Sequence, residues 1–122
     1  MTKRDYQILQ KIAKHQRELK SMITEFKIKS HDDLSKIHPA IRRGLVGFIG
    51  DIFELTRPLS DLTQVKLPFN NTTIKAFRNA ASHRYETISN VMVYACLTHC
   101  TDKNIAKAIQ DLIAEGFDGE AN

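Results

Sequence analysis

Apolar residues recur every three or four positions through two long stretches of the chain. The first stripe consists of Ile8, Ile12, His15, Leu19, Met22 and Phe26, and the second of Ile41, Leu45, Phe48, Ile52, Leu55 and Leu59. This spacing puts each set on one face of a helix, so it predicts two long amphipathic helices that share a core. Pro39 suits the first turn of the second helix, and residues 30–33 offer capping side chains for a short helical turn near Leu34.

Turn-forming residues break this pattern at 60–73, which predicts the main loop of the chain. Helical spacing resumes at residues 74–77 and 88–95, and a last helix around 105–112 is capped by Thr101 or Asp102. No alternating apolar stretch is long enough to predict a strand. The pattern predicts an all-α antiparallel helical bundle of four to five helices at residues 1–115, followed by a flexible acidic tail at 116–122.

Four residues in the two predicted long helices carry expectations of their own. His15 is expected to be a core histidine that is hydrogen-bonded to a neighbour, in preference to a ligand. Gly44, Gly47 and Gly50 lie three apart in the second helix and cost helix propensity, so they predict a close helix crossing. They do not form a phosphate-binding loop, because no strand precedes them and no Lys-Ser or Lys-Thr follows.

The composition is that of one ordinary globular domain, with 122 residues, 42% of them hydrophobic and 26% charged. The apolar runs are too short to cross a membrane and the first residues do not resemble a secretory signal, so we expect a cytoplasmic protein. Cys96 and Cys100 flank His99, but a structural zinc site usually has four ligands. We expect these cysteines to pack in a core helix, without a disulfide, and we expect no metal or cofactor.

The charge is unevenly distributed along the chain. The formal net charge is +4, and residues 1–43 contain eleven Lys or Arg against five Asp or Glu. A basic segment favours a polyanionic partner such as RNA, because Lys and Arg displace the counterions of phosphates. A run of charges is more often a solvated helix face, so charge alone supports this partner weakly.

Residues 78–85 read Arg-Asn-Ala-Ala-Ser-His-Arg-Tyr and concentrate polar chemistry in a short segment. Histidine can accept and return a proton near neutral pH, and arginine can bind a phosphate through two parallel hydrogen bonds. Together they suit phosphodiester cleavage by the 2′-hydroxyl of the RNA itself. The alternative is that Arg78 and Arg84 are surface charges while His83 and Tyr85 pack, and the chemistry alone does not choose between them.

The spacing of these residues restricts how they can meet. On an ideal helix Arg78 and His83 would lie about 140° apart, whereas Arg78 and Tyr85 would share a face. Arg78 and His83 can therefore act on one phosphate only if the helix is broken between them or if a second protomer completes the site.

The order of arginine, four residues, histidine, any residue and tyrosine resembles the motif of the HepT-like branch of the HEPN superfamily. Members of this branch are ribonuclease toxins that pair with a minimal nucleotidyltransferase antitoxin. Arg4-Asp5 before Ile8-Leu9, residues 42–54 and Leu67-Pro68-Phe69 also resemble family segments, so the likeness extends to about Leu112. The chain departs from the family at Asp51, where Glu is usual, and at Phe69, where Trp is frequent.

The resemblance implies a homodimer that cleaves RNA in a shared cleft without a metal. Arg78 would bind and polarise the scissile phosphate, His83 would act as general acid-base, Asn79 would orient a neighbour and Tyr85 would contact phosphate. The nucleotidyltransferase would transfer AMP to Tyr85. Two other functions stay open at this point: a non-catalytic subunit that binds substrate for a nucleotidyltransferase or regulates it, and a purely structural bundle.

Overall fold

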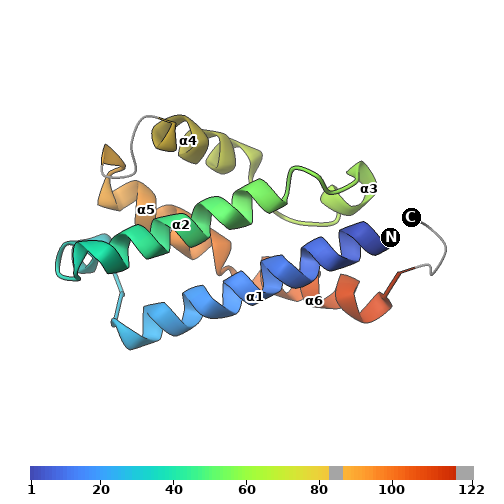
Figure 1. The fold of residues 1–122 in the computed structure, drawn as a ribbon, viewed down its shortest axis with the longest axis horizontal. Helices are drawn as coiled ribbons and strands as arrows, with labels where there is room; N and C mark the ends of the chain where they lie inside the picture. Colours follow the sequence, from blue (N-terminus) through green and yellow to red (C-terminus); the bar gives the residue numbers. More distant parts are fainter. Residues whose placement is uncertain (83–86, 118–122) are drawn as a thin grey trace.

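The computed structural model describes residues 1–82 and 87–117, and all regular elements in these ranges are helical. They are α1 (Lys3–Glu25), the 3₁₀ helix η1 (His31–Ser35), α2 (Pro39–Leu55), α3 (Asp61–Gln64), α4 (Asn71–Ala81), α5 (Asn90–Cys100) and α6 (Lys103–Glu115). The long helices α1 and α2 pack together in opposite directions, with α5 and α6 behind them and α4 along one edge (Figure 1). The predicted all-α bundle is confirmed.

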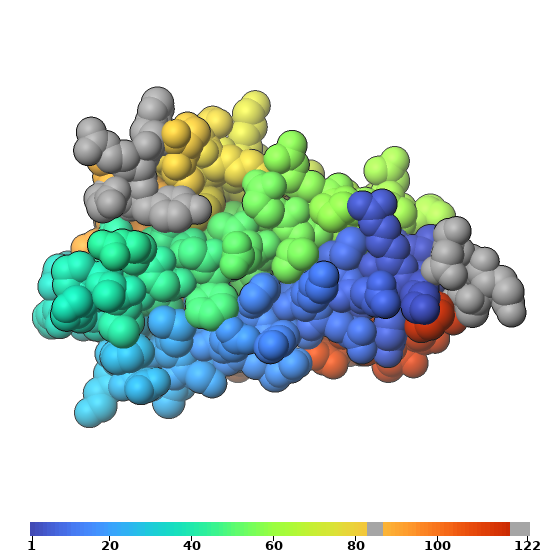
Figure 2. Space-filling view, in the orientation of Figure 1, coloured from blue at the N-terminus to red at the C-terminus, as the bar shows by residue number. Residues whose placement is uncertain are grey.

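The two predicted long helices are α1 and α2. Thr2 begins α1 by accepting a hydrogen bond from the Asp5 amide at 3.1 Å. Pro39 occupies the first turn of α2, and His38 precedes it as the capping residue. The residues at the core centre of these helices are fully buried: Leu9, Ile12, Leu19, Leu45, Ile49, Ile52 and Phe53. Figure 2 shows that α1, α2 and α4 together form one broad face of the molecule.

The prediction of an uninterrupted loop at 60–73 is wrong, because α3 lies within it and α4 begins at Asn71. The cause is Asp5, whose buried carboxylate accepts hydrogen bonds from the Ser60 amide at 3.1 Å and the Ser60 hydroxyl at 2.5 Å. The Thr63 hydroxyl donates to the same carboxylate at 2.6 Å. These partners are 55 and 58 residues from Asp5 along the chain, so local sequence could not predict them.

Helix α5 carries both cysteines, and α6 begins at the expected capping residue. Cys96 and Cys100 are free thiols in the core, and burial raises the pKa of Cys96 to about 11. The cap of α6 is Asp102, which accepts hydrogen bonds from the amides of Asn104 and Ile105. Within residues 1–82 and 87–117, no cluster of three or more His, Cys, Asp or Glu could hold a metal. No helix in those ranges is both long and apolar enough to span a membrane.

The expectations for His15 and for Gly44 and Gly47 are wrong. A Cβ at Gly44 would meet the Met22 side chain at an ordinary 3.8 Å, and one at Gly47 would meet nothing within 4 Å. No close helix crossing therefore requires these two glycines. The Nδ1 atom of His15 has no hydrogen-bond partner in the described ranges and lies 4.0 Å from Glu18 Oε2. The His15 ring instead packs against Phe48, because it sits at the edge of the α1–α2 contact.

The beginning of the predicted tail contacts the bundle. Gly116 ends α6 with φ of 75°, a conformation that a residue with a side chain rarely adopts. The ring of Phe117 lies 5.0 Å from the ring of Tyr6 on α1. Residues 118–122 of the predicted tail lie outside the described residues.

Candidate functional site

The site is built from Arg78 in the last turn of α4. Helix α4 begins at Asn70, whose side chain accepts a hydrogen bond from the Thr73 amide at 3.1 Å, and it buries Ile74 and Phe77. The Phe77 ring packs edge-on against Phe53 of α2, with centroids 5.4 Å apart. Arg78 follows directly, at the border between this buried face and solvent, and its side chain is 33% exposed.

The guanidinium of Arg78 is held by the C-terminal end of α2. Its Nε donates to Glu54 Oε1 at 3.1 Å, and an Nη donates to the Phe53 carbonyl at 3.2 Å. The second Glu54 oxygen accepts from Arg57 at 3.3 Å. A guanidinium has five N–H donors, and the remaining three of Arg78 bond to none of the described residues. The side chain is therefore fixed in position while most of its donors stay available to a ligand.

A hollow of about 330 Å³ lies beside Arg78. Its lining comes from α2 and from the end of α4: Gly50, Asp51, Phe53, Glu54, Phe77, Arg78, Ala81 and Ser82. Gly50 has no side chain that could project from α2 into this hollow. Asp51 and Glu54 both line this hollow, and Glu54 also forms an ion pair with Arg57 at 3.3 Å, which offsets part of its charge.

Helix α4 ends at Ala81, three residues after Arg78. The Ser82 amide donates to the Arg78 carbonyl at 2.9 Å, and its hydroxyl donates to the Asn79 carbonyl at 2.8 Å. In the described part of the chain α4 thus ends between Arg78 and His83, as one of the two alternatives drawn from the sequence requires. The 140° separation and the shared face of Arg78 and Tyr85 were derived for an unbroken helix, and they concern His83 and Tyr85, which lie outside the described ranges.

Only part of the predicted site can be placed. Arg78 and Asn79 lie side by side in sequence at the end of α4, and Asn79 is exposed. His83 and Tyr85 lie outside the described residues.

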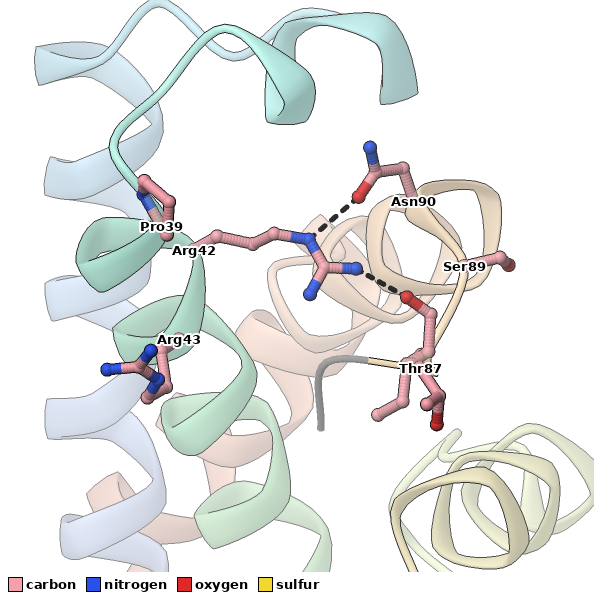
Figure 3. Close-up of a pocket in the computed structure, with 7 residues that line it drawn as sticks. Pro39, Arg42, Arg43, Thr87, Ser89 and Asn90 are labelled. Atoms are coloured by element: carbon pink, nitrogen blue, oxygen red, sulfur yellow. Dashed lines mark hydrogen bonds between the residues drawn. The ribbon is translucent and has the colours of Figure 1, made fainter. Parts of the chain in front are cut away.

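The chain that follows the motif is fixed to the start of α2. Arg42 Nε donates to Asn90 Oδ1 at 2.7 Å, and the same guanidinium donates to the Ile88 carbonyl (Figure 3). Ser89 begins α5 by accepting a hydrogen bond from the Met92 amide at 3.2 Å. Seven residues line a hollow of about 480 Å³ here: Pro39, Arg42, Arg43, Thr87, Ile88, Ser89 and Asn90.

Helix α2 therefore holds the chain on both sides of residues 83–86. Glu54, near its end, binds Arg78 before this segment, and Arg42, near its start, binds Ile88 and Asn90 after it. Arg42 and Glu54 are twelve positions apart, or about 18 Å along a helix. Sequence reasoning missed both residues. The family resemblance covered residues 42–54, but no local pattern marks contacts with residues 24 to 48 positions away.

His99 belongs to the packing of the bundle. Its Nε2 accepts a hydrogen bond from the Asn70 amide at 3.0 Å, and its ring packs against Phe53 and Phe69. Burial lowers the pKa of His99, although the charge of Asp102 opposes this. A neutral His99 that accepts at Nε2 helps to begin α4, so it positions the helix that carries Arg78.

Comparison of the chain with protein-family models, curated proteins and solved structures found no match. The resemblance to the HepT-like branch thus rests on the residues quoted above.

Proposed function

We propose that this protein is a metal-independent endoribonuclease and the toxin of a toxin–antitoxin pair. The observation that carries the proposal is the state of Arg78: fixed by Glu54 and the Phe53 carbonyl, open to a hollow, and followed by a helix end before His83. An arginine held by two hydrogen bonds, with three further donors, suits a phosphate, and a helix that ends at Ala81 is compatible with one of the two arrangements in which Arg78 and His83 could act on the same phosphate.

The reaction that these residues would carry out is transesterification at the scissile phosphate. Arg78 binds the non-bridging oxygens. His83 accepts the proton of the 2′-hydroxyl, the 2′-oxygen forms a bond to phosphorus, and the bond from phosphorus to the 5′-oxygen breaks. The leaving 5′-oxygen receives a proton from a histidinium. The products are a 2′,3′-cyclic phosphate and a 5′-hydroxyl, and every proton is accounted for without water or an added ion.

Asn79 and Glu54 have supporting roles in this proposal. Asn79 follows Arg78 at an exposed position, from which it would orient a neighbouring group or the RNA. Glu54 holds the Nε edge of Arg78, so the free donors present one orientation to the phosphate. Glu54 also repels the phosphate, which makes it a compromise between orientation and affinity.

The homodimer, the antitoxin and the modification follow from the family resemblance. Two protomers would bring their motif segments together in one RNA cleft. The partner nucleotidyltransferase would neutralise the toxin in the cytoplasm: the Tyr85 hydroxyl attacks the α-phosphorus of ATP, and pyrophosphate leaves as AMP is attached. The added phosphate and adenosine would block the entry of RNA beside His83.

The first test is cleavage of RNA by the purified protein in excess EDTA. We expect activity to persist and the product to end in a 2′,3′-cyclic phosphate or its hydrolysed form. His83→Ala and Arg78→Ala should each lower kcat by about 100-fold or more, while Lys103→Ala serves as an exposed control. Cleavage that requires a divalent metal, or that survives His83→Ala unchanged, contradicts the proposal. A protein without nuclease activity that still binds a nucleotidyltransferase would be the non-catalytic subunit.

The second test concerns Tyr85. The protein is incubated with a minimal nucleotidyltransferase encoded beside its gene, ATP and magnesium, and its peptides are weighed by mass spectrometry. An AMP adduct on the Tyr85 peptide with matching loss of nuclease activity supports the switch. Full neutralisation with no adduct on that peptide shows that the partner acts by covering the cleft.

A further inference from the structure

The outer face of α1 is the most basic helix surface among the described residues. Six of its residues are exposed cations: Lys3, Arg4, Lys11, Lys14, Arg17 and Lys20. None of the six forms an ion pair with a described residue. The only carboxylate between Lys3 and Arg17 is Asp5, which is 2% exposed and bound by Ser60 and Thr63. This face is therefore strongly basic, although Glu18 follows Arg17 in sequence and the carboxylates of Asp51 and Glu54 line a hollow with Lys11.

The positions of these cations follow one side of the helix. At 100° per residue, five of the six side chains, from Arg17 round to Arg4, fall within an arc of about 140°, opposite the buried Ile12, and Lys20 lies about 60° beyond Arg17. Lys14 lies near the centre of the arc. From Lys3 to Arg17 the row extends about 21 Å, at 1.5 Å per residue. A row of this length matches a flexible polyanion that contacts several successive charges.

Adjoining hollows connect this face to Arg78. The first, of about 430 Å³, is lined by Gln7, Gln10, Lys11 and Lys14. The second, of about 270 Å³, shares Lys11 with the first and is also lined by His15, Asp51, Glu54 and Leu55. The third is the hollow beside Arg78, which shares Asp51 and Glu54 with the second. All three lie on α1, α2 and α4, which form one face in Figure 2.

We propose that the outer face of α1, centred on Lys11, Lys14 and Arg17, binds the phosphate backbone of single-stranded RNA outside the reaction site. This inference rests on the proposed function for its choice of RNA as the polyanion. Lys and Arg without carboxylate partners gain by binding phosphates, since each contact releases a condensed counterion. Glutamine amides between the cations add donors for phosphate or sugar oxygens.

The carboxylates of Asp51 and Glu54 limit where the backbone can bind. They lie between α1 and Arg78, so phosphates are expected against α1 and against Arg78, and not over the middle of the path. The α1 face would then supply sequence-independent affinity, while Arg78 and His83 act on the one phosphate that reaches them.

The test measures RNA affinity as salt is varied. The probe is a fluorescent single-stranded 2′-O-methyl RNA, which lacks the nucleophilic hydroxyl and cannot be cleaved by the proposed reaction. Its Kd is measured by anisotropy from 0.05 to 0.5 M KCl for the wild type and for the triple variant Lys11→Gln, Lys14→Gln, Arg17→Gln. Glutamine keeps helix propensity at these exposed positions. A matched triple variant, Lys36→Gln, Lys103→Gln, Lys107→Gln, removes the same charge elsewhere.

For single strands, each phosphate contact contributes about −0.7 to the slope of log K against log salt. Losing three contacts should make the slope shallower by about 2, so the wild type loses about 100-fold more affinity than the α1 variant over this salt range. The matched variant should keep the slope of the wild type. No RNA binding by the wild type, an unchanged slope in the α1 variant, or an equal change in both variants would overturn the inference.

Cleavage of unmodified RNA by the wild type is measured in parallel and tests the proposed function by itself. If the wild type binds the probe through α1 but cleaves nothing, the nuclease proposal fails and the RNA-binding face stands. If the wild type cleaves but both variants keep its slope, the nuclease proposal stands and the α1 inference fails.

Discussion

Replacing Asp5 should destabilise the bundle more than any other single change of an acidic residue in the described part of the chain. Asp5 is 2% exposed, and its carboxylate accepts hydrogen bonds from the Ser60 amide, the Ser60 hydroxyl and the Thr63 hydroxyl. These bonds connect the first turn of α1 to the start of α3, two elements far apart in sequence. The change tested is Asp5→Ala, with Asp5→Asn as the isosteric variant.

The expected size follows from the three bonds. A hydrogen bond to a charged group contributes about 1.5–3 kcal/mol, so three would give about 4.5 kcal/mol or more. Two effects reduce this value. Removing Asp5 relieves the cost of burying a carboxylate, and the hydroxyls of Ser60 and Thr63, already 3.2 Å apart, can bond to each other. We expect Asp5→Ala to lower the free energy of unfolding by about 3 kcal/mol and the midpoint temperature of thermal unfolding by about 12 °C. Asp5→Asn should cost about half as much.

The pH dependence of the free energy of unfolding tests the role of the Asp5 carboxylate independently. Burial alone would raise the pKa of Asp5, but hydrogen bonds from Ser60 and Thr63 outweigh it and lower the pKa below 3.8. A carboxyl whose pKa is lower in the folded state stabilises the fold above its unfolded pKa of about 3.9 and loses this contribution as pH falls through the folded value. The stability gap between wild type and Asp5→Asn should therefore narrow below about pH 4.

Urea unfolding followed by circular dichroism at pH 3 to 7 measures both effects. Asp111→Ala is the matched control, because Asp111 is an exposed carboxylate whose loss should change stability by less than about 0.5 kcal/mol. The reasoning is refuted if Asp5→Ala costs no more than Asp111→Ala, or if the gap between wild type and Asp5→Asn is the same at pH 3 and pH 7.

Three further predictions concern Glu54, Arg42 and Cys96. Glu54→Gln keeps an acceptor for Arg78 but removes the charge that repels phosphate, so KM for RNA should fall about threefold. Glu54→Ala removes the acceptor as well and should lower kcat. Steady-state kinetics measure both values, and equal behaviour of the two variants contradicts the proposed role of Glu54. Arg42→Gln loses the bonds to Ile88 and Asn90 and should lower the free energy of unfolding by about 1–2 kcal/mol; an unchanged urea midpoint argues against it. Cys96 should resist a thiol reagent at pH 8 in the native state and react after unfolding, because its pKa of about 11 and its burial suppress the thiolate; rapid native labelling contradicts this.

The helices could be predicted because their signals are local. The three-and-four spacing of residues 8–26 and 41–55, Pro39 in a first turn and the cap at Asp102 depend on neighbours within one or two turns. The sequence also limited the candidate site to residues 78–85, and it indicated that Arg78 and His83 could act together only if the helix broke between them or if a second protomer completed the site. Helix α4 ends at Ala81.

The errors arise where distant parts of the chain meet. The loop prediction failed at α3 because Asp5 supplies the hydrogen bonds that fix Ser60. The glycine prediction failed at Gly44 and Gly47 because a helix can carry small residues on its open face as well as at a crossing, and spacing does not distinguish the two. The hydrogen bond expected at His15 is missing because apolar periodicity predicts which face of the helix a side chain lies on, but not whether a polar partner lies next to it.

The arrangement around α2 explains how a short polar segment can be positioned by a small bundle. Residues 83–86 are joined on one side to Arg78, held by Glu54, and on the other to Ile88, held by Arg42. Both contacts come from one helix whose core side is fully buried at Leu45, although the Glu54 side chain itself is 55% exposed. Short polar segments carry function most effectively on a rigid support. Here α2 supplies the contacts on both sides of residues 83–86, through Arg42 near its start and Glu54 near its end.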